Sequence, residues 1–194
     1  CRISIGHDSR LSADSLCHSI MDGLIFDGAQ VLDCSLASTP SMFMSCIFED
    51  YDCDGAIMVT ASHLPFNRNG MKFFDKDGGL NKEDIARIIE IANTQSFIHE
   101  NNGSCTKANL MDTYSRHLQE IIKEGVNAPD HEHPLKGLHM VVDAGNGAGG
   151  FYVEKVLKPL GANVEGSQFL EPDGHFPNHI PNPEDKKAMD SICQ

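Results

Sequence analysis

Short apolar segments alternate with longer segments of helical periodicity along this chain, and this alternation constrains the fold more than any other feature. The apolar segments lie at residues 3–5, 31–34 and 57–59. Apolar runs of this length predict buried strands. Strands that alternate with helices favour an α/β fold, and we expect a three-layer α/β/α domain with a mixed sheet.

The segments between these strands repeat apolar residues at helical spacing. One helix is predicted after Ser12, which is suited to be its N-cap, and Gly28 lies where it should stop. The clearest helix follows Asn81, because Asp84 comes three residues later and completes a capping-box pattern. A further helical stripe covers residues 110–121 and should close the first unit.

Residues 127–134 combine two prolines with polar and charged side chains, which is typical of a linker. We therefore predict a first domain at residues 1–128 and a second at residues 135–194. The second should be of the same type, with a strand at 140–142, a glycine turn, a helix at about 151–160 and a strand near 163–165. It is expected to stop just inside a further helix, as a truncated domain.

The formal charge of −13, with 28 acidic against 15 basic side chains, argues against a nucleic-acid partner. No apolar run approaches the roughly 20 residues of a membrane-spanning helix, and no leader is visible. The seven cysteines are widely spread and never spaced as CxxC, which indicates reduced thiols in an intracellular compartment.

The loop after the strand at 57–59 carries the most reactive side chains. Ser62, His63 and Lys72 follow the strand end, where α/β sheets meet their ligands. Ser62 could present its hydroxyl to a phosphoryl group, and Lys72 could move a proton or neutralise charge. The alternative is a capped turn that leads into an edge hairpin.

The segment GHDSR, residues 6–10, ends the first strand with a glycine followed by a guanidinium. Arg10 at this position suits an anion at the same sheet edge. The alternative is a contact between Asp8 and Arg10 that only pins the loop.

The segment DAGNGAGG places Gly145, Gly147 and Gly150 in a GxGxxG pattern between a predicted strand and a predicted helix. This context fits a dinucleotide-binding module. The alternative is a tight turn in which the glycines permit close packing or a positive φ. The later histidines, among them His175 and His179, match no zinc motif, and their proline-rich loop is predicted to be a solvated surface segment.

In combination these segments resemble the α-D-phosphohexomutases, the family of phosphoglucomutase, phosphomannomutase and phosphoglucosamine mutase, over nearly the whole chain and in the family's order. The residue sequences of two segments most resemble those of plant and algal phosphoglucosamine-mutase-like members, which suggests that the protein is located in a plastid. The segments that carry the resemblance are GHDSR, TASHLP, NGMKF, DAGNGAGG and PDGHFPNHIPNPE.

The resemblance implies an intramolecular phosphotransferase that interconverts hexose or hexosamine 1- and 6-phosphates through a sugar 1,6-bisphosphate. It makes Ser62 the phosphoserine, whose phosphate would also ligate Mg²⁺. It makes Lys72 the general acid/base, and it assigns Arg10 and His63 to stabilising the charge of the transferring group.

Two departures from the family pattern stand out. Leu64 occupies a position where many bacterial members carry a polar asparagine. The sequence also stops before the aspartate-rich metal loop that the family carries, so Ser62 is the only metal ligand expected here. Residues 1–194 alone should have negligible turnover, and a catalytically dead paralogue is a further alternative.

Overall fold

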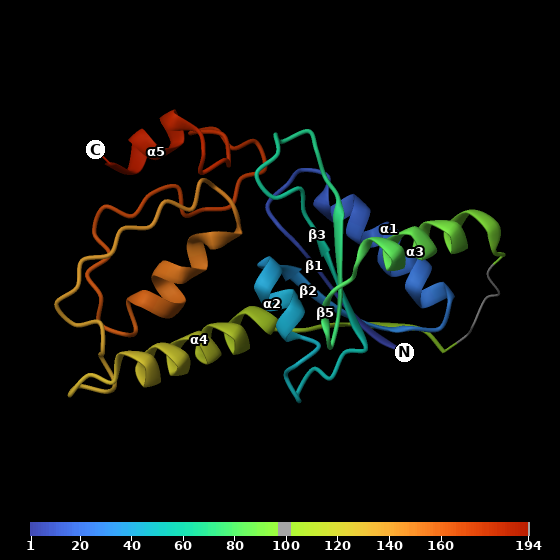
Figure 1. Cartoon of the computed structure of the whole chain (residues 1–194), viewed down its shortest axis with the longest axis horizontal. Coiled ribbons are helices and arrows are strands. Elements are labelled where there is room, and N and C mark those ends of the chain that lie inside the picture. The colour runs from blue at the N-terminus through green and yellow to red at the C-terminus, as the bar shows by residue number, and fades with distance from the viewer. Residues whose placement is uncertain (97–101, 194) are drawn as a thin grey trace. The chain divides into compact units, whose positions relative to one another are not determined.

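The computed structural model describes residues 1–96 and 102–193, and it divides the chain into two compact units (Figure 1). Neither unit is a continuous piece of sequence, because the short segments 8–11 and 61–69 belong to the second. The first unit comprises Cys1–His7, Ser12–Thr60 and Gly70–Ala108; the second comprises Asp8–Leu11, Ala61–Asn69 and Asn109–Gln194.

Among the described residues, the first unit contains a six-stranded sheet in the order β5-β4-β3-β1-β2-β6. Strand β1 pairs in parallel with β2 and β3, and β2 pairs in parallel with β6. Strand β4 is antiparallel to β3 and β5 is antiparallel to β4, so the sheet is mixed, as predicted. The strands are β1 Arg2–His7, β2 Gln30–Leu36, β3 Gly55–Val59, β4 Met71–Asp75, β5 Gly78–Gly79 and β6 Ser104–Lys107.

Helices cover both faces of this sheet. Figure 1 shows α1 (Ala13–Phe26) and α3 (Lys82–Thr94) on one side and α2 (Thr39–Met44) on the other. Adjacent residues of β1 explain the two layers, because side chains alternate between the faces of a strand. Ile5 packs in the core cluster with Cys17 of α1, whereas a Cβ atom at Gly6 would lie 2.5 Å from the sulfur of Met42 on α2. The predicted three-layer α/β/α domain is confirmed.

Local signals set the ends of the helices in this unit. Asn81 Oδ1 accepts from the backbone N–H of Asp84 at 3.0 Å, and Asp84 Oδ2 accepts from the N–H of Asn81 at 3.2 Å. This is the predicted capping box. Ser12 occupies the N-cap position of α1, but its side chain makes no capping bond to that helix. Gly28 has a φ of 82° just beyond the end of the helix.

The second unit has its own apolar core. Leu135, Val156 and Leu160 are buried and pack against Leu118 and Ile122 of the long helix α4. The Lys123 side chain of the same helix bonds to Glu132, in the exposed segment that leads from α4 to Leu135. The helical elements are α4 Leu110–Val126, the 3₁₀ helix η1 Ala148–Gly150, the π-helix η2 Val153–Leu157 and α5 Lys186–Cys193.

The strands predicted at 140–142 and 163–165 do not form a regular ladder, and this prediction is wrong. Two isolated parallel bridges replace it, His139 with Asn163 and Asp143 with Gln168. The register shifts by one residue between the bridges, because residues 164–167 turn back on themselves through a bond from the Ser167 N–H to the Val164 carbonyl. The Ser167 hydroxyl accepts the Val142 N–H instead of a strand carbonyl.

The seven cysteines, all within the described residues, are free thiols. Burial is the main reason that the pKa of Cys17 and the pKa of Cys34 both rise to about 12, so these thiols stay neutral at physiological pH. None of the described helices is long and apolar enough to span a membrane.

Replacement of Asn81 by alanine should lower the free energy of unfolding by about 1 kcal/mol, because the first turn of α3 loses the acceptor of its capping box. Urea unfolding followed by circular dichroism measures this loss. Lys82→Ala, one residue further on, removes no capping bond and serves as the control. An equal stability of the two variants would contradict the assignment of the cap.

Candidate functional site

Ser62 lies on a loop with an unusual backbone. It has a φ of 55°, in the left-handed region, where a residue with a side chain is strained. Such strain costs on the order of 1–3 kcal/mol and persists where surrounding contacts impose it, often at functional sites. The loop, residues 61–69, follows β3 in sequence and belongs to the second unit.

The side chain of Arg10 imposes the shape of this loop. Arg10 is 2% exposed, and a guanidinium has five N–H groups. All five donate within the chain. Nε donates to Asp8 Oδ2 at 3.1 Å, Nη1 to the carbonyls of Pro65 at 2.7 Å and Arg68 at 3.0 Å, and Nη2 to the carbonyls of Ser62 at 2.7 Å and Leu64 at 2.8 Å.

These bonds define what Arg10 does in this structure. Its charge is balanced by Asp8, and its plane lies over the ring of Phe176 with the guanidinium carbon 5.4 Å from the ring centroid. Because every N–H is already in use, Arg10 offers none to a ligand here. The contact between Asp8 and Arg10 that pins the loop, one of the two alternatives from the sequence, is therefore present.

A cavity of about 380 Å³ opens beside Ser62. This volume lies within the range of small-molecule sites. Both Ser62 and His63 are exposed at its edge. The lining residues are Ser62, His63, Pro181, Asn182, Pro183 and Glu184, all of the second unit.

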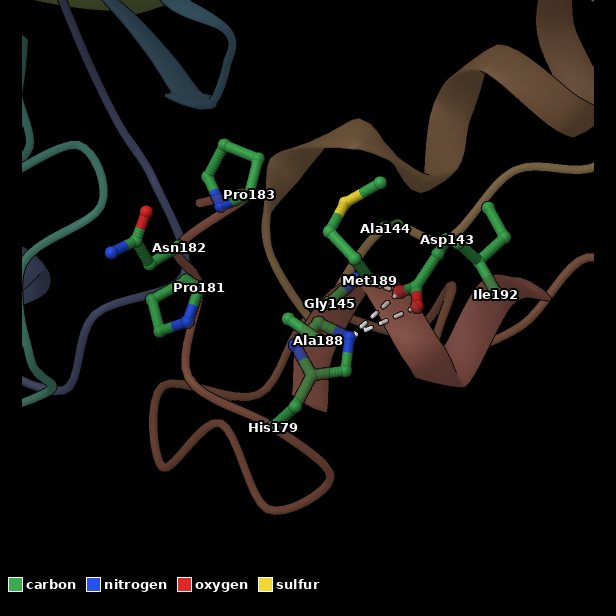
Figure 2. Close-up of a pocket in the computed structure, with 10 residues that line it drawn as sticks. All are labelled: Asp143, Ala144, Gly145, His179, Pro181, Asn182, Pro183, Ala188, Met189 and Ile192. Atoms are coloured by element: carbon green, nitrogen blue, oxygen red, sulfur yellow. Dashed lines mark hydrogen bonds and ion pairs between the residues drawn. The ribbon is translucent and has the colours of Figure 1, made fainter. Parts of the chain in front are cut away.

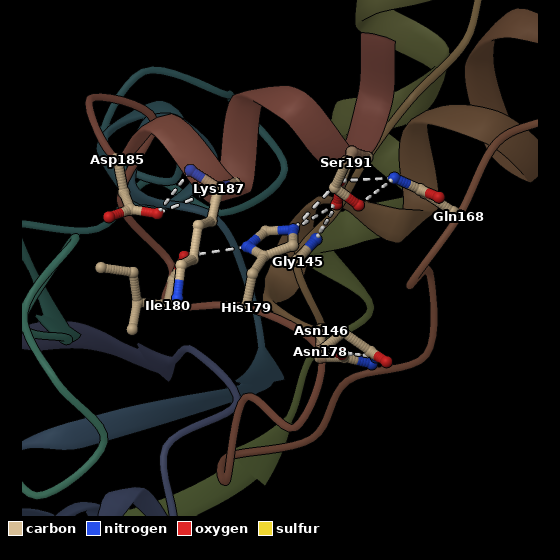
Figure 3. Close-up of polar contacts among 11 residues, drawn as sticks. Gly145, Asn146, Gln168, Asn178, His179, Ile180, Asp185, Lys187 and Ser191 are labelled. Atoms are coloured by element: carbon tan, nitrogen blue, oxygen red, sulfur yellow. Dashed lines mark hydrogen bonds and ion pairs between the residues drawn. The ribbon is translucent and has the colours of Figure 1, made fainter. Parts of the chain in front are cut away.

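Asn146 and Gly174 hold the proline-rich loop that contributes the opposite wall. Asn146 is buried, and its Nδ2 donates to the Glu171 carbonyl at 2.9 Å. Its Oδ1 accepts from Asn178 Nδ2 at 2.7 Å (Figure 3). Gly174 approaches the Arg10 segment so closely that a Cβ atom would lie 2.4 Å from the Ser9 carbonyl oxygen. Only glycine fits there.

The glycines of the DAGNGAGG segment serve packing. Gly145 has a φ of 52°, and a Cβ atom at Gly150 would lie 2.0 Å from the carbonyl oxygen of Leu170. The turn leads into the three-residue helix η1. The tight-turn alternative explains these glycines, and nothing in their surroundings requires a dinucleotide.

His179 and Asp143 are residues that the sequence reasoning missed. The ring nitrogen Nε2 of His179 lies 3.0 and 3.1 Å from the two carboxylate oxygens of Asp143 (Figure 2). The side chains are only 12% and 8% exposed, so the prediction of a solvated loop histidine is wrong for His179. The available signal was the position of Asp143 at the end of a predicted strand, before a glycine turn.

The predicted site residues fall into both units. Ser62, His63 and Arg10 belong to the second unit. Lys72 belongs to the first, on β4, where it pairs in register with Met58 and is exposed. Within the described part of the chain, no group of three or more His, Cys, Asp or Glu side chains could hold a metal ion.

Comparison with known proteins identifies the family. The model of phosphoglucomutase/phosphomannomutase alpha/beta/alpha domain I matches residues 1–99, and that of domain II matches residues 112–194. The chain therefore belongs to the phosphoglucomutase/phosphomannomutase family.

Individual relatives agree with this assignment. The chain is 32% identical over 193 residues to a phosphoglucomutase of Neisseria gonorrhoeae, which covers 98% of this chain and 39% of the relative. It is 34% identical over 191 residues to a phosphomannomutase of Escherichia coli, and this alignment covers 94% of this chain and 40% of the relative. It thus spans about two fifths of the length of the curated relatives that it matches.

A solved structure shares the fold. The phosphoglucomutase/phosphomannomutase family protein of Burkholderia thailandensis superimposes with a TM-score of 0.81 at 26% identity, covering 98% of this chain and 40% of that one. The particular resemblance to plant and algal members, and with it the plastid, stays a prediction.

Ser62→Gly should be more stable than Ser62→Ala by about 1 kcal/mol, because glycine adopts a φ of 55° without the steric cost that alanine meets. Thermal unfolding of the two variants measures the difference. The same two substitutions at Ser104, on the regular strand β6, serve as the control, and there Ser104→Ala should be more stable than Ser104→Gly. Equal stabilities at position 62 would show that the left-handed backbone is absent in solution.

Arg10→Lys should destabilise the protein by about 3 kcal/mol, because an ammonium group cannot fill five acceptors in the plane of a guanidinium. Hydrogen exchange of the amides at 62–68 should speed up. Arg68→Lys on the same loop changes an exposed side chain and keeps the backbone carbonyl, so it should behave like the unmodified protein. Unchanged exchange in Arg10→Lys would contradict the proposed clamp, which is the set of hydrogen bonds by which Arg10 holds the 61–69 loop.

Proposed function

We propose that the full-length protein is a phosphohexomutase, an intramolecular phosphotransferase that interconverts the 1-phosphate and 6-phosphate of a hexose or hexosamine. The names of its relatives support this class of reaction. The observation that carries the proposal is Ser62, which holds a strained left-handed backbone on a clamped loop at the edge of a cavity.

In the proposed reaction, phosphorylated Ser62 donates its phosphoryl group to a free hydroxyl of the sugar phosphate. The bond from phosphorus to Ser62 Oγ breaks, a bond to the sugar oxygen forms, and Lys72 accepts the proton of that hydroxyl as general base. Ser62 Oγ leaves with the electron pair of the broken bond and takes a proton from water. The resulting sugar 1,6-bisphosphate turns around, and Ser62 Oγ recovers a phosphoryl group from its other end while its hydroxyl proton passes to water. Lys72 then acts as general acid at the sugar oxygen that leaves.

Two further residues support this transfer. His63 lines the cavity next to Ser62 and is exposed, so it can contact the transferring phosphoryl group directly. Arg10 acts by a different route from the one that the family resemblance implies. Because its N–H groups are bound to the loop, we assign it to holding Ser62 in place, while its charge acts on the phosphate only at a distance.

Mg²⁺ is the cofactor that we propose for the full-length protein. Phosphate oxygens are ligands that Mg²⁺ prefers, so the phosphate on Ser62 would supply one ligand from this chain. The described residues contain no group of three carboxylates, histidines or cysteines to complete a site. As the family resemblance implies, we propose that the remaining ligands come from parts of the full-length protein outside this chain.

The first experiment measures phosphate on Ser62. Full-length protein purified without phosphatase should carry about one phosphate per chain on the Ser62 peptide in mass spectrometry, and incubation with glucose 1-phosphate should discharge it. Ser62→Ala provides the control without a nucleophile. An unmodified Ser62 that glucose 1,6-bisphosphate cannot charge would contradict the mechanism and favour the catalytically dead paralogue.

A further inference from the structure

We propose that His179 is a positioning residue for phosphoryl transfer, which holds residues 181–184 in place as one wall of the cavity at Ser62. This inference rests on the proposed function of that cavity and adds a residue that acts through its neighbours rather than by touching the substrate. His179 does not line the cavity at Ser62 itself.

The contacts of the His179 ring favour its protonated form. Nδ1 lies 2.9 Å from the carbonyl oxygen of Ile180, and Nε2 lies 3.0 and 3.1 Å from the carboxylate oxygens of Asp143 (Figures 2 and 3). Both partners only accept. A neutral imidazole has a single N–H, so both bonds form together only when the ring is a doubly protonated imidazolium.

Asp143 is held ready for this pairing by neutral donors. The backbone N–H of Gly145 donates to Oδ1 at 2.8 Å, and Gln168 Nε2 donates to Oδ2 at 2.9 Å. The ring of Phe169 also meets the His179 ring edge-on, with the centroids 5.5 Å apart. The hydrogen bonds and this ring contact together hold the imidazolium in one orientation.

The Ile180 carbonyl connects the ring to the cavity wall. It accepts the His179 Nδ1–H and also the backbone N–H of Asn182 at 2.8 Å. Asn182 Oδ1 in turn accepts the Glu184 N–H at 3.0 Å. Pro181 and Pro183 fix φ on either side of Asn182, so a shift of the Ile180 carbonyl moves the whole segment.

The same three residues form walls of two cavities. Pro181, Asn182 and Pro183 line the cavity at Ser62 and also a second cavity of about 270 Å³, which is lined by Asp143 and His179 as well (Figure 2). The ion pair lines one of these cavities, and the candidate nucleophile lines the other. Changes in the ion pair should therefore reach Ser62 through the three residues that the two cavities share.

The charge of the ring makes this support dependent on pH. Burial is the largest single influence and lowers the pKa of His179, but the Ile180 carbonyl, Asp143 and the nearby Asp185 together raise it above its ordinary value of 6.5. Because the pKa is raised in the folded state, the support is fully present at low pH. It is lost as the pH rises through the raised pKa.

The test compares variants of the full-length protein in a mutase assay. His179→Gln keeps one donor but cannot serve both acceptors, and kcat should fall on the order of 100-fold with a much smaller change in KM. Asp143→Asn removes the negative charge that raises the pKa of His179, so the alkaline decline of kcat with pH should begin at a lower pH. If His179 had only a structural role, that decline would stay at the same pH.

His175→Gln is the matched control on the same loop. The His175 Nδ1 contact with Asp173 has the same length, 3.0 Å, but the side chains are 68% and 43% exposed. Exposed pairs of this kind contribute little. Both kcat and its pH profile should stay unchanged.

Hydrogen exchange gives a readout that does not require turnover. The amides of Asn182, Glu184 and Asp185 are bonded within the segment, and their exchange should speed up about tenfold in His179→Gln, the effect of roughly one lost hydrogen bond. Unchanged exchange in α4, which belongs to the same unit as His179, shows that this unit of the variant is folded.

The two readouts separate the possible failures. Unchanged exchange at 182–185 in folded His179→Gln overturns the proposal, and so does faster exchange with unchanged kcat. If the unmodified protein has no turnover, the proposed function fails, and the exchange data alone then decide whether His179 holds the wall.

Discussion

The buried guanidinium of Arg10 is the interaction on which the candidate site depends. A charge removed from water is tolerated only when it is paired and hydrogen-bonded throughout, and Arg10 meets this condition with one carboxylate and four backbone carbonyls. Those carbonyls must converge on a single point, so the loop has one shape. The left-handed φ of Ser62 is part of that shape, and its strain is balanced by the clamp.

The second wall of the cavity uses a related arrangement. Asp143 pairs with His179 as Asp8 pairs with Arg10, and in both cases the remaining N–H groups of the cation bind backbone carbonyls of a loop. The difference lies in the cation. A guanidinium stays charged at every physiological pH, whereas an imidazolium loses its proton. The loop of Ser62 is therefore held permanently, and the opposite wall is held as long as His179 is protonated.

The glycine pattern at 145–150 shows how one sequence signal can serve two structures. A dinucleotide site needs glycines so that a phosphate can approach the backbone, whereas here the approaching group is the chain itself. The Leu170 carbonyl occupies the space that a side chain at Gly150 would need, and the His179 ring lies against Gly145. Spacing alone does not distinguish a ligand from a neighbouring loop, because both require the same missing Cβ atom.

The sequence by itself determined what depends on residues close together in the chain: the alternation of strands and helices, the capping box of Asn81 and Asp84, and the position of Ser62 after a strand. Only the tertiary structure decided what depends on distant residues. The hydrogen bonds that Arg10 makes to the 61–69 loop, the ion pair of His179 with Asp143 and the two isolated bridges that replace the predicted ladder each join residues more than 20 apart in the chain. Local periodicity carries no information about such contacts, because they follow from how the folded segments pack.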